Sequence, residues 1–547
     1  MGVTNLNISI LQRIGRLTSL EFLSLQDFNF EGTFPDQGPL HLPTHSHQNL
    51  TSLDISINLF HGNIPIQVDA YLPMLSNLNI SINDFDGRIP SSIGDMNSLE
   101  TLDLSYNELS GKIPEHLAKS CINLEYLVLS NNSLEGQIFS AANFNLKYLS
   151  RLQLDGNHFI GKIPECMSNS SYLEGLYLTD NRLSGRIPSW LGNMSRLVDL
   201  IMPNNHLQGP IPPEFCLLQN LQVLNLVENN ISGNLPSCFN PPQIQQVQVS
   251  RNKLQGQLKD AFFNSSSLVT LDLGYNRFND LSHNNLSRQI PHCLDTTSLR
   301  DNYDVAFNTT SSTAGGPSAS PMRKEETIEF TTKNISYSYQ GKVLTYVSGV
   351  DLSCNKLTSK IPYQIGNLTR IHTLNLSFNN LTGSIPSTFS NLEQIESLDL
   401  SHNNLNGKIP QNITDQFCLA VFSVAYNNLL GKTPERIAQF GTFKESSYQG
   451  NPLLCGLPLP KSCGSPPLAP NAATNIEEDS NFMDMDIFYI SFTASYIVVV
   501  LAIAIVLEIC NLNISLMVLT VLKSQNWVEG EKNSDCCQWE KVECNNY

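Results

Sequence analysis

The sequence predicts an α/β solenoid: a curved superhelix with a parallel sheet on its concave face, followed by one transmembrane helix. Three observations predict this fold. One frame, L-x-x-L-x-L-x-x-N-x-L-x-G-x-I-P, returns roughly every 24 residues. Within each frame, the L-x-L alternation is typical of a short strand with one buried face. After the last frame comes an uncharged stretch of about 20 residues, which is long enough to cross a bilayer as a helix.

The frame predicts how each coil packs. Its plainest copy covers residues 99–114, where Leu102 and Leu104 face one side of the predicted strand and Asp103 faces the other. A single coil is too small to bury its own leucines. Neighbouring coils must therefore stack and share one core, with looser helical turns on the convex side. The frame recurs in residues 173–188, 197–212, 221–236, 371–386 and 395–410.

A column of asparagines follows the predicted strands, where the chain turns into the core. Each amide can satisfy backbone groups buried there, so the loss of one should cost about 1–3 kcal/mol. The glycine at the next fixed position permits close backbone approach, and the Ile-Pro pair supplies an apolar anchor and a preset φ. The column comprises Asn83, Asn107, Asn132, Asn157, Asn181, Asn205, Asn229, Asn379 and Asn403.

The L-x-G-x-I-P variant of the frame resembles the plant extracellular leucine-rich repeat family over most of residues 20–434. A first block of repeats covers residues 1–291 and is interrupted near 278–281, where the sequence passes directly into the middle of another repeat. Part of two coils is missing there. This indicates either a locally broken stack or a spliced or imperfect gene model.

An island interrupts the repeats further on. The frame vanishes in residues 292–346, which include a Ser/Thr/Gly stretch, and it returns as four coils in residues 347–434. An island before four final repeats resembles the arrangement of plant receptor-like proteins. The resemblance implies that the island and the adjoining coils take part in ligand or co-receptor contact. An insertion loop with no binding role is the alternative.

The segments after the last coil carry further family features. Residues 435–463 resemble the C-terminal cap of the family, and the resemblance implies a disulfide between Cys455 and Cys463. An acidic juxtamembrane linker follows in residues 464–486, then the predicted transmembrane helix 487–507 and a tail 508–547. The tail contains a segment that resembles the family's N-terminal cap in the wrong place, and no signal peptide is visible at Met1. Both features indicate a truncated or fused gene model.

Composition and motifs disfavour several functions. Asp and Glu number 49 against 32 Lys and Arg, and the resulting net charge of −17 repels nucleic acid. We find no nucleotide-binding glycine loop, no kinase catalytic-loop pattern and no catalytic triad in recognisable context, so we expect neither enzyme activity nor a cofactor. The histidine cluster is interpreted as a solvated loop rather than a metal site. It comprises His41, His45, His47 and His61.

Cysteines and glycosylation sequons indicate the compartment. The 13 cysteines are an odd number, so at least one is free or pairs between chains. Cys216 and Cys238 lie about one coil apart, either as a bridge between coils or as two free thiols. Sequons of the form Asn-x-Ser/Thr fit a secreted, glycosylated surface. They recur at Asn7, Asn49, Asn79, Asn131, Asn169, Asn193, Asn230, Asn264, Asn285, Asn308, Asn334, Asn367, Asn375, Asn380 and Asn412.

The middle coils carry the predicted ligand surface. Exposed strand positions should be polar unless something covers them, yet several here are apolar or aromatic, whereas the final coils carry small polar residues such as Thr373 and Ser397. The alternative is that these are ordinary strand-formers on a solvated face. A glycan on Asn79 or Asn375 would cover the concave face at its own coil. The predicted ligand residues are Tyr126, Val128, Arg151, Gln153, Tyr177, Ile201, Val223 and Asn225.

These observations predict a single-pass receptor in the plasma membrane with its repeats outside the cell. The receptor would bind an extracellular peptide, protein or glycan. Its tail is too short for a kinase domain, so a co-receptor kinase must supply the catalytic step in defence or development. Two alternatives remain open: an extracellular inhibitor of cell-wall-degrading enzymes, like the pectinase-inhibiting members of the family, and a non-functional receptor fragment.

Overall fold

The computed structural model describes residues 19–33, 49–140, 144–257, 268–280, 327–332, 335–340 and 348–463. Within these ranges, no helix has both the length and the apolar character needed to span a bilayer. The predicted linker 464–486, transmembrane helix 487–507 and tail 508–547 lie outside the described residues.

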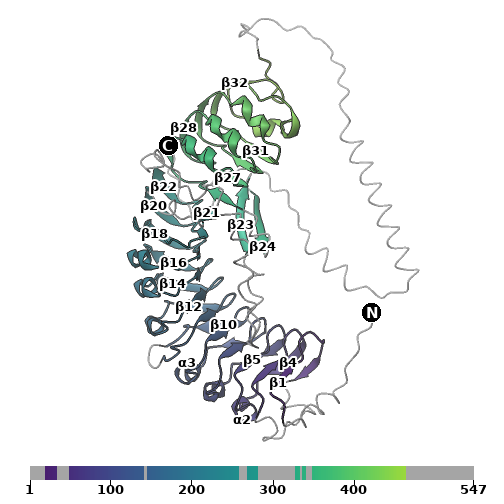
Figure 1. Ribbon diagram of the computed structural model, residues 1–547, viewed down its shortest axis with the longest axis vertical. Coiled ribbons are helices and arrows are strands. Elements are labelled where there is room, and N and C mark those ends of the chain that lie inside the picture. Colours follow the sequence, from purple (N-terminus) through teal and green to yellow (C-terminus); the bar gives the residue numbers. More distant parts are fainter. Residues whose placement is uncertain are drawn as a thin grey trace, which may run out of the picture. The chain divides into compact units, whose positions relative to one another are not determined.

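A parallel sheet of 15 strands, here called the first sheet, runs through the solenoid with one strand from each coil (Figure 1). It confirms the predicted parallel-sheet solenoid. The L-x-L alternation explains the short strands, because the central residue points into the core and its two neighbours point away. The strands are β1 (Phe22–Ser24), β3 (Ser52–Asp54), β5 (Asn77–Asn79), β7 (Thr101–Asp103), β9 (Tyr126–Val128), β11 (Arg151–Gln153), β13 (Gly175–Tyr177), β15 (Asp199–Ile201), β17 (Val223–Asn225), β19 (Gln246–Gln248), β21 (Thr270–Asp272), β25 (Gly349–Asp351), β27 (Thr373–Asn375), β29 (Ser397–Asp399) and β31 (Val421–Ser423).

The leucines of successive coils form one continuous core. Leu102 of β7 lies in register with Leu127 of β9, and Leu127 lies in register with Leu152 of β11. All three side chains are fully buried. Because each coil contacts only its neighbours, these strand leucines are buried by the coils before and after them.

A buried ladder of asparagines joins each coil to the one before it. Asn181 is representative: its Oδ1 accepts the N–H of Phe159 at 3.0 Å, and its Nδ2 donates to the carbonyls of Leu154 at 2.9 Å and Leu178 at 3.3 Å. These bonds satisfy backbone groups that the turn would otherwise leave unpaired in the core. This is the role predicted from the sequence, and the ladder also includes Asn58, Asn252, Asn276, Asn355, Asn427 and Asn451.

The L-x-G part of the frame forms a second ladder of strands that the sequence pattern did not predict. At Gly185 the backbone has φ +83°, and a Cβ there would lie 2.7 Å from Cγ of Lys162 in the preceding coil, so the position requires glycine. Strands β2 (Glu31–Thr33), β4 (Leu59–Asn63) and β6 (Asp84–Asp86) form a separate sheet. The remaining 13 strands are β8 (Ser110–Gly111), β10 (Ser133–Gly136), β12 (His158–Gly161), β14 (Arg182–Arg186), β16 (His206–Gly209), β18 (Asn230–Asn234), β20 (Lys253–Gln257), β22 (Arg277–Asp280), β26 (Thr358–Lys360), β28 (Asn380–Gly383), β30 (Asn404–Gly407), β32 (Asn428–Lys432) and β33 (Leu453–Cys455).

Short helices complete the coils. In most coils the proline of the Ile-Pro pair directly precedes the helix, as Pro188 does with φ −68°, because its fixed φ suits a helix start. The helices are α2 (Val68–Tyr71), η1 (Ser91–Asp95), α3 (Glu115–Ser120), η2 (Glu165–Asn169), η3 (Ser189–Asn193), η4 (Pro213–Leu217), η9 (Tyr363–Asn367), η10 (Ser387–Asn391), η11 (Gln411–Asp415), η12 (Ala438–Gly441) and η13 (Glu445–Ser447). In the coil of β9, Ile138-Phe139 replaces Ile-Pro, and the described residues of that coil contain no helix.

The first sheet continues directly from β21 to β25. Leu271 lies in register with Val350, and the N–H groups of Leu273 and Tyr275 donate to the carbonyls of Asp351 and Ser353 at 2.8 Å each. The solenoid is therefore stacked across the point where the leucine frame is lost from the sequence.

Within the predicted island, β23 (Thr327–Thr332) and β24 (Ile335–Gln340) form an antiparallel hairpin. The backbone of β23 comes within 8 Å of β25 and of β29, measured between Cα atoms. Figure 1 shows the two strands of the hairpin. The hairpin therefore lies against the part of the first sheet that follows the insertion.

The C-terminal end of the solenoid is closed by aromatic side chains and a disulfide. Phe422 contacts the rings of Phe440, Phe443 and Tyr448, with centroids 5.1–5.8 Å apart. The structure contains the disulfide between Cys455 and Cys463 that the family resemblance implied. These contacts cover the last leucines, which have no further coil to bury them.

Candidate functional site

The eight predicted ligand residues lie on five adjacent strands of the first sheet, from β9 to β17. Tyr126, Arg151 and Gly175 are neighbours in one row across the strands, and Val128, Gln153 and Tyr177 are neighbours in the other. The structure therefore brings the predicted residues together on one face. Their accessibility differs: Tyr126 is exposed, Arg151, Val223 and Asn225 are half-buried, and Val128, Gln153, Tyr177 and Ile201 are buried.

Tyr177 forms the floor of this surface. Its hydroxyl donates to Oδ2 of Asp199 at 2.6 Å, and the guanidinium of Arg151 lies 5.6 Å from its ring centroid. The ring also lies close over Gly175, where an added Cβ would come within 2.6 Å of Tyr177 Cε2. The absence of a side chain at Gly175 therefore allows the ring to lie along the sheet, where Asp199 fixes it.

Gln153 presents a buried acceptor beside this floor. Its side chain is 4% exposed, and its Oε1 has no hydrogen-bond partner in the structure. A buried amide oxygen without a partner costs about 1–3 kcal/mol, so such a group calls for an explanation. A bound molecule that donates an N–H or O–H to Oε1 would remove this cost.

The sequence pattern did not identify two further contact surfaces, one exposed and one partly exposed. On one flank, the rings of Tyr148 and Tyr172 lie 5.4 Å apart, and Arg196 lies 4.4 Å above Tyr172. These residues share one position, directly before the first leucine of three successive frames, and that alignment could have identified them.

The second missed surface consists of the residues before three ladder asparagines. Phe378, His402 and Tyr426 each adopt a left-handed φ of +52° or +53°. There the rings of Phe378 and His402 stack 4.0 Å apart, and those of His402 and Tyr426 stack 4.4 Å apart. The outward turn of the backbone places these side chains one coil apart, at stacking distance.

Outward residues are also buried in the coils on both sides of the insertion. Thr270, Thr373 and Ser397 are polar, yet each is at most 8% exposed. The hairpin β23–β24 approaches the sheet in this region. This face is therefore less accessible to a ligand than Tyr126, which is 38% exposed.

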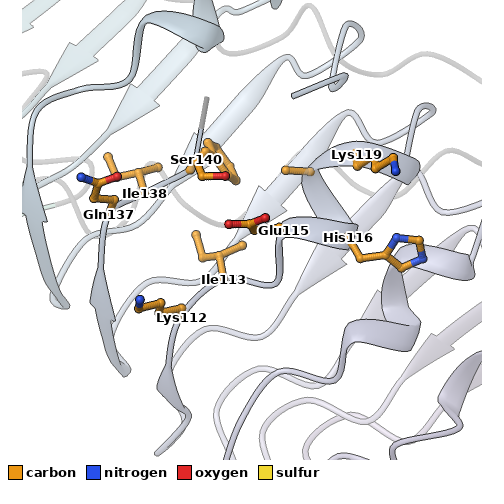
Figure 2. A pocket seen from close by; sticks show the side chains of 10 residues that line it. Lys112, Ile113, Glu115, His116, Lys119, Gln137, Ile138 and Ser140 are labelled. Atoms are coloured by element: carbon orange, nitrogen blue, oxygen red, sulfur yellow. The ribbon is translucent and has the colours of Figure 1, made fainter. Parts of the chain in front are cut away.

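A cavity of about 380 Å³ lies beside α3, next to the coil whose described residues contain no helix. Figure 2 shows the carboxylate of Glu115 near Ile113, whereas the ring of His116 points away from it. The charges around the cavity are mixed, so it selects no single class of ligand. Its lining residues are Lys112, Ile113, Glu115, His116, Ala118, Lys119, Gln137, Ile138, Phe139 and Ser140.

Ser120, His116 and Asp95 are aligned near this cavity in the manner of a catalytic triad. His116 Nε2 lies 2.7 Å from Asp95 Oδ1, and His116 Nδ1 lies 3.3 Å from Ser120 Oγ. The His–Asp pair is open to water, with side chains 39% and 57% exposed. Ser120 is not part of the cavity wall, so a substrate held there would not meet its hydroxyl. We interpret the arrangement as a helix-surface hydrogen-bond chain.

Among the described residues, no group of three or more His, Cys, Asp or Glu side chains is placed to hold a metal ion. Of the histidine cluster, only His61 is described, and His41, His45 and His47 lie outside the described ranges.

Cys216 and Cys238 form a disulfide between neighbouring coils rather than two free thiols. Cys121, Cys166 and Cys418 are free.

The sequons fall into three groups. Asn79 is half-buried, whereas Asn375 is only 2% exposed, and its Nδ2 donates to Asp351 Oδ2 at 3.2 Å. Asn7, Asn264, Asn285, Asn308 and Asn334 lie outside the described residues. The exposed sequon residues are Asn49, Asn131, Asn169, Asn193, Asn230, Asn367, Asn380 and Asn412.

Comparisons with known proteins agree with this architecture. Profiles of the leucine rich repeat family match residues 98–120, 123–143, 172–194, 220–241 and 346–405. Cuscuta receptor 1 of Solanum lycopersicum is 42% identical over 534 residues, covering 85% of this chain and 47% of that protein. The chain thus spans about half the length of this relative.

Two further similarities concern Arabidopsis proteins. Receptor-like protein 1 of Arabidopsis thaliana is 60% identical over 177 residues, covering 31% of this chain and 16% of that protein. The crystal structure of the Arabidopsis receptor kinase HAESA, in complex with the peptide hormone IDA and the co-receptor SERK1, has a TM-score of 0.59 and 26% identity. That match covers 81% of this chain and 67% of the HAESA chain.

Proposed function

This chain belongs to the plant leucine-rich repeat receptor-like proteins, and from this premise we propose that it acts as a cell-surface receptor. The first sheet binds an extracellular peptide, protein or glycan. Residues 487–507 anchor the chain in the plasma membrane with the repeats outside, and a partner receptor kinase supplies the signalling chemistry. The kinship with receptor-like proteins and the fold shared with a peptide-hormone receptor support this proposal.

The ligand surface extends from β9 to β17, and the buried acceptor Gln153 is the observation that carries this assignment. A ligand donor completes the hydrogen bond of Gln153 Oε1, while its apolar part packs on Tyr126 and Ile201. Arg151, Val223 and Asn225 border these contacts and fix the ligand's orientation.

A binding assay tests this surface. The probe is extracellular fluid from plant leaves, fractionated by size and divided into protease-treated, glycosidase-treated and untreated samples. The readout is association of the full-length chain with a co-receptor kinase in leaf cells after each treatment. Loss of association after protease identifies a peptide or protein ligand, and loss after glycosidase identifies a glycan.

Two variants locate the site. Gln153→Ala should weaken the response about tenfold or more, because it removes a buried hydrogen bond of about 1.4 kcal/mol. Tyr363→Ala removes an exposed tyrosine of η9, outside the first sheet, and should leave the response unchanged. Equal responses in wild type, Gln153→Ala and Tyr126→Ala would place the ligand elsewhere.

Topology is tested separately. Expression of the full chain in plant cells, followed by glycosidase treatment, should shift its mobility if the exposed sequons such as Asn193 and Asn412 reach the secretory lumen. An unshifted product would contradict an extracellular solenoid.

A further inference from the structure

The third residue of each strand in the first sheet belongs to one column that points away from the leucine core. In most of the described column, another side chain separates one acidic residue from the next. Asn79 lies between Asp54 and Asp103. Asn375 lies between Asp351 and Asp399. Asn375 donates its Nδ2 to Asp351 Oδ2, so an amide supplies the proton donor there. Asp272 and Asp351 are the one pair of acids that are direct neighbours in the described column.

The geometry at this pair leaves no amide between the two carboxyl groups. A Cβ at Gly274 would lie 3.1 Å from Asp351 Oδ1 and 3.4 Å from Asp272 Oδ1, so both oxygens border the same small space. In the coils of Asp103 and Asp399, a serine two residues later donates its hydroxyl to the aspartate. Gly274 has no hydroxyl, so the donor found in those coils is missing beside Asp272.

Other groups partly satisfy the pair. Asp272 accepts the N–H of Gly274 at 3.1 Å and the hydroxyl of Ser250. Asp351 accepts the N–H of Ser353 at 2.8 Å. These hydrogen bonds hold each carboxyl group in place.

The surroundings favour a proton at this site. Asp272 is 8% exposed and Asp351 is 3% exposed. Burial and the neighbouring Asp351 raise the pKa of Asp272 to about 8, and burial raises the pKa of Asp351 to about 6. Two buried carboxylates on neighbouring strands repel one another unless one is protonated.

No nearby positive charge among the described residues is free to neutralise the second carboxylate in place of the proton. Arg251 of the preceding coil lowers the pKa of Asp272, but its Nη1 is paired with Glu228 at 2.8 Å. Asp399 of β29 lies two strands from Asp351, and its negative charge also raises the pKa of Asp351. Tyr275 is neutral because burial raises its pKa to about 12. β23 carries one acidic residue in its sequence, Glu329.

We propose that Asp272 and Asp351 share one proton, which acts as a latch between the coils before the insertion and the coils after it. The place is unusual, because β21 and β25 pair although the whole insertion separates them in the sequence. Loss of the proton leaves two buried negative charges side by side. The β21–β25 contact then loosens as the pH rises, together with the coils against which the hairpin β23–β24 lies.

Hydrogen exchange of the purified full-length chain tests this latch. The reporters are the amides of Leu273 and Tyr275, which bond across the junction. The protection factor of each amide is its intrinsic exchange rate divided by its observed rate. It should fall about tenfold or more between about pH 5.5 and pH 8.5, because one pKa unit is a tenfold change in protonation. In Asp272→Asn the fall should be less than about twofold, because the new amide can donate to Asp351 as Asn375 does.

The controls separate this latch from other causes. Asp399→Asn changes a buried acid whose register neighbours are Asn375 and Ser423, so the Asp272–Asp351 pair remains. Protection should still fall about tenfold or more, at a slightly lower pH because one negative charge that raises the pKa of Asp351 is gone. Glu329→Gln should keep the wild-type pH dependence, because it changes the hairpin and not the pair. Protection that does not vary with pH in wild type, or that varies equally in Asp272→Asn, would overturn the proposal. Restoration of protection at high pH by added Ca²⁺ would also overturn it, since the pair would then hold a cation.

Discussion

Replacement of Asn355 by alanine tests whether the asparagine ladder joins the two blocks of coils across the insertion. Asn355 Oδ1 accepts the N–H of Phe278 at 3.0 Å, and its Nδ2 donates to the carbonyls of Leu273 at 3.0 Å, Leu352 at 3.2 Å and Ser353 at 3.0 Å. Alanine removes all four bonds in a buried site. If one or two backbone groups stay unpaired, the free energy of unfolding should fall by about 2–4 kcal/mol.

Asn427→Ala is the matched control. Asn427 makes the same four bonds, to Leu405 N and to the carbonyls of Leu400, Val424 and Ala425. Its partner coil lies only 22 residues away in the sequence, whereas Phe278 is 77 residues from Asn355. The loss of hydrogen-bond energy should therefore be similar in the two variants. Only Asn355→Ala, however, weakens a contact between coils that are not joined by a short stretch of chain.

Urea unfolding, combined with hydrogen exchange on separate peptides, distinguishes the two variants. We expect Asn355→Ala to split the unfolding transition, with the coils after the insertion opening at lower urea than those before it. Asn427→Ala should shift one transition without splitting it. A single transition of unchanged midpoint in Asn355→Ala would refute the reasoning, because the ladder would then contribute nothing at the junction.

Four further predictions follow from the described contacts. Tyr177→Phe removes the hydroxyl that donates to buried Asp199 and should lower the free energy of unfolding by about 1–3 kcal/mol in urea titrations. Gly185→Ala should cost about 1–2 kcal/mol in the same assay because φ is +83°. Gly441→Ala should cost less, because Gly441 has an ordinary φ and an added Cβ would meet only the carbonyl oxygen of Arg436, at a contact distance of 3.5 Å. Glycopeptide mass spectrometry of plant-expressed chain should find Asn375 unmodified, because its amide is buried and bonded, and exposed Asn412 modified. The pKa values of Asp272 and Asp351 are raised to about 8 and about 6 by burial, so the folded state binds more protons than the unfolded chain above about pH 4. The free energy of unfolding should therefore fall as pH rises through about 4 to 8, and a pH-independent value would contradict those shifts.

Much of the fold could be predicted because each coil repeats the same local requirements. Leu102 and Leu104 flank Asp103, and this alternation alone indicates a strand with one buried face. Asn107 follows at a fixed distance and bonds as predicted. The second ladder of strands was missed because the L-x-G part of the frame, such as Leu183 and Gly185, is too short to show a repeated alternation of apolar and polar residues. Their strand geometry depends on the neighbouring coil, with which they pair.

The candidate site was predictable only in part. Position in the frame identified which residues face outward from β9 to β17, but it could not show how far each is exposed. Tyr177 was expected to project as a ligand contact, yet its ring lies over Gly175 and bonds to Asp199. The exposed pair Tyr148 and Tyr172 precedes the strands, where the outward pattern of the frame does not apply.

The sequence by itself determined the coil, the asparagine ladder and the family, because these depend on short spacings that recur along the chain. Only the tertiary structure decided that β21 pairs with β25, since that contact joins residues on opposite sides of an insertion with no leucine frame. It also decided which outward residues are buried and that Asp272 meets Asp351. Such contacts depend on which coils become neighbours, and local sequence spacing does not specify neighbours across an insertion.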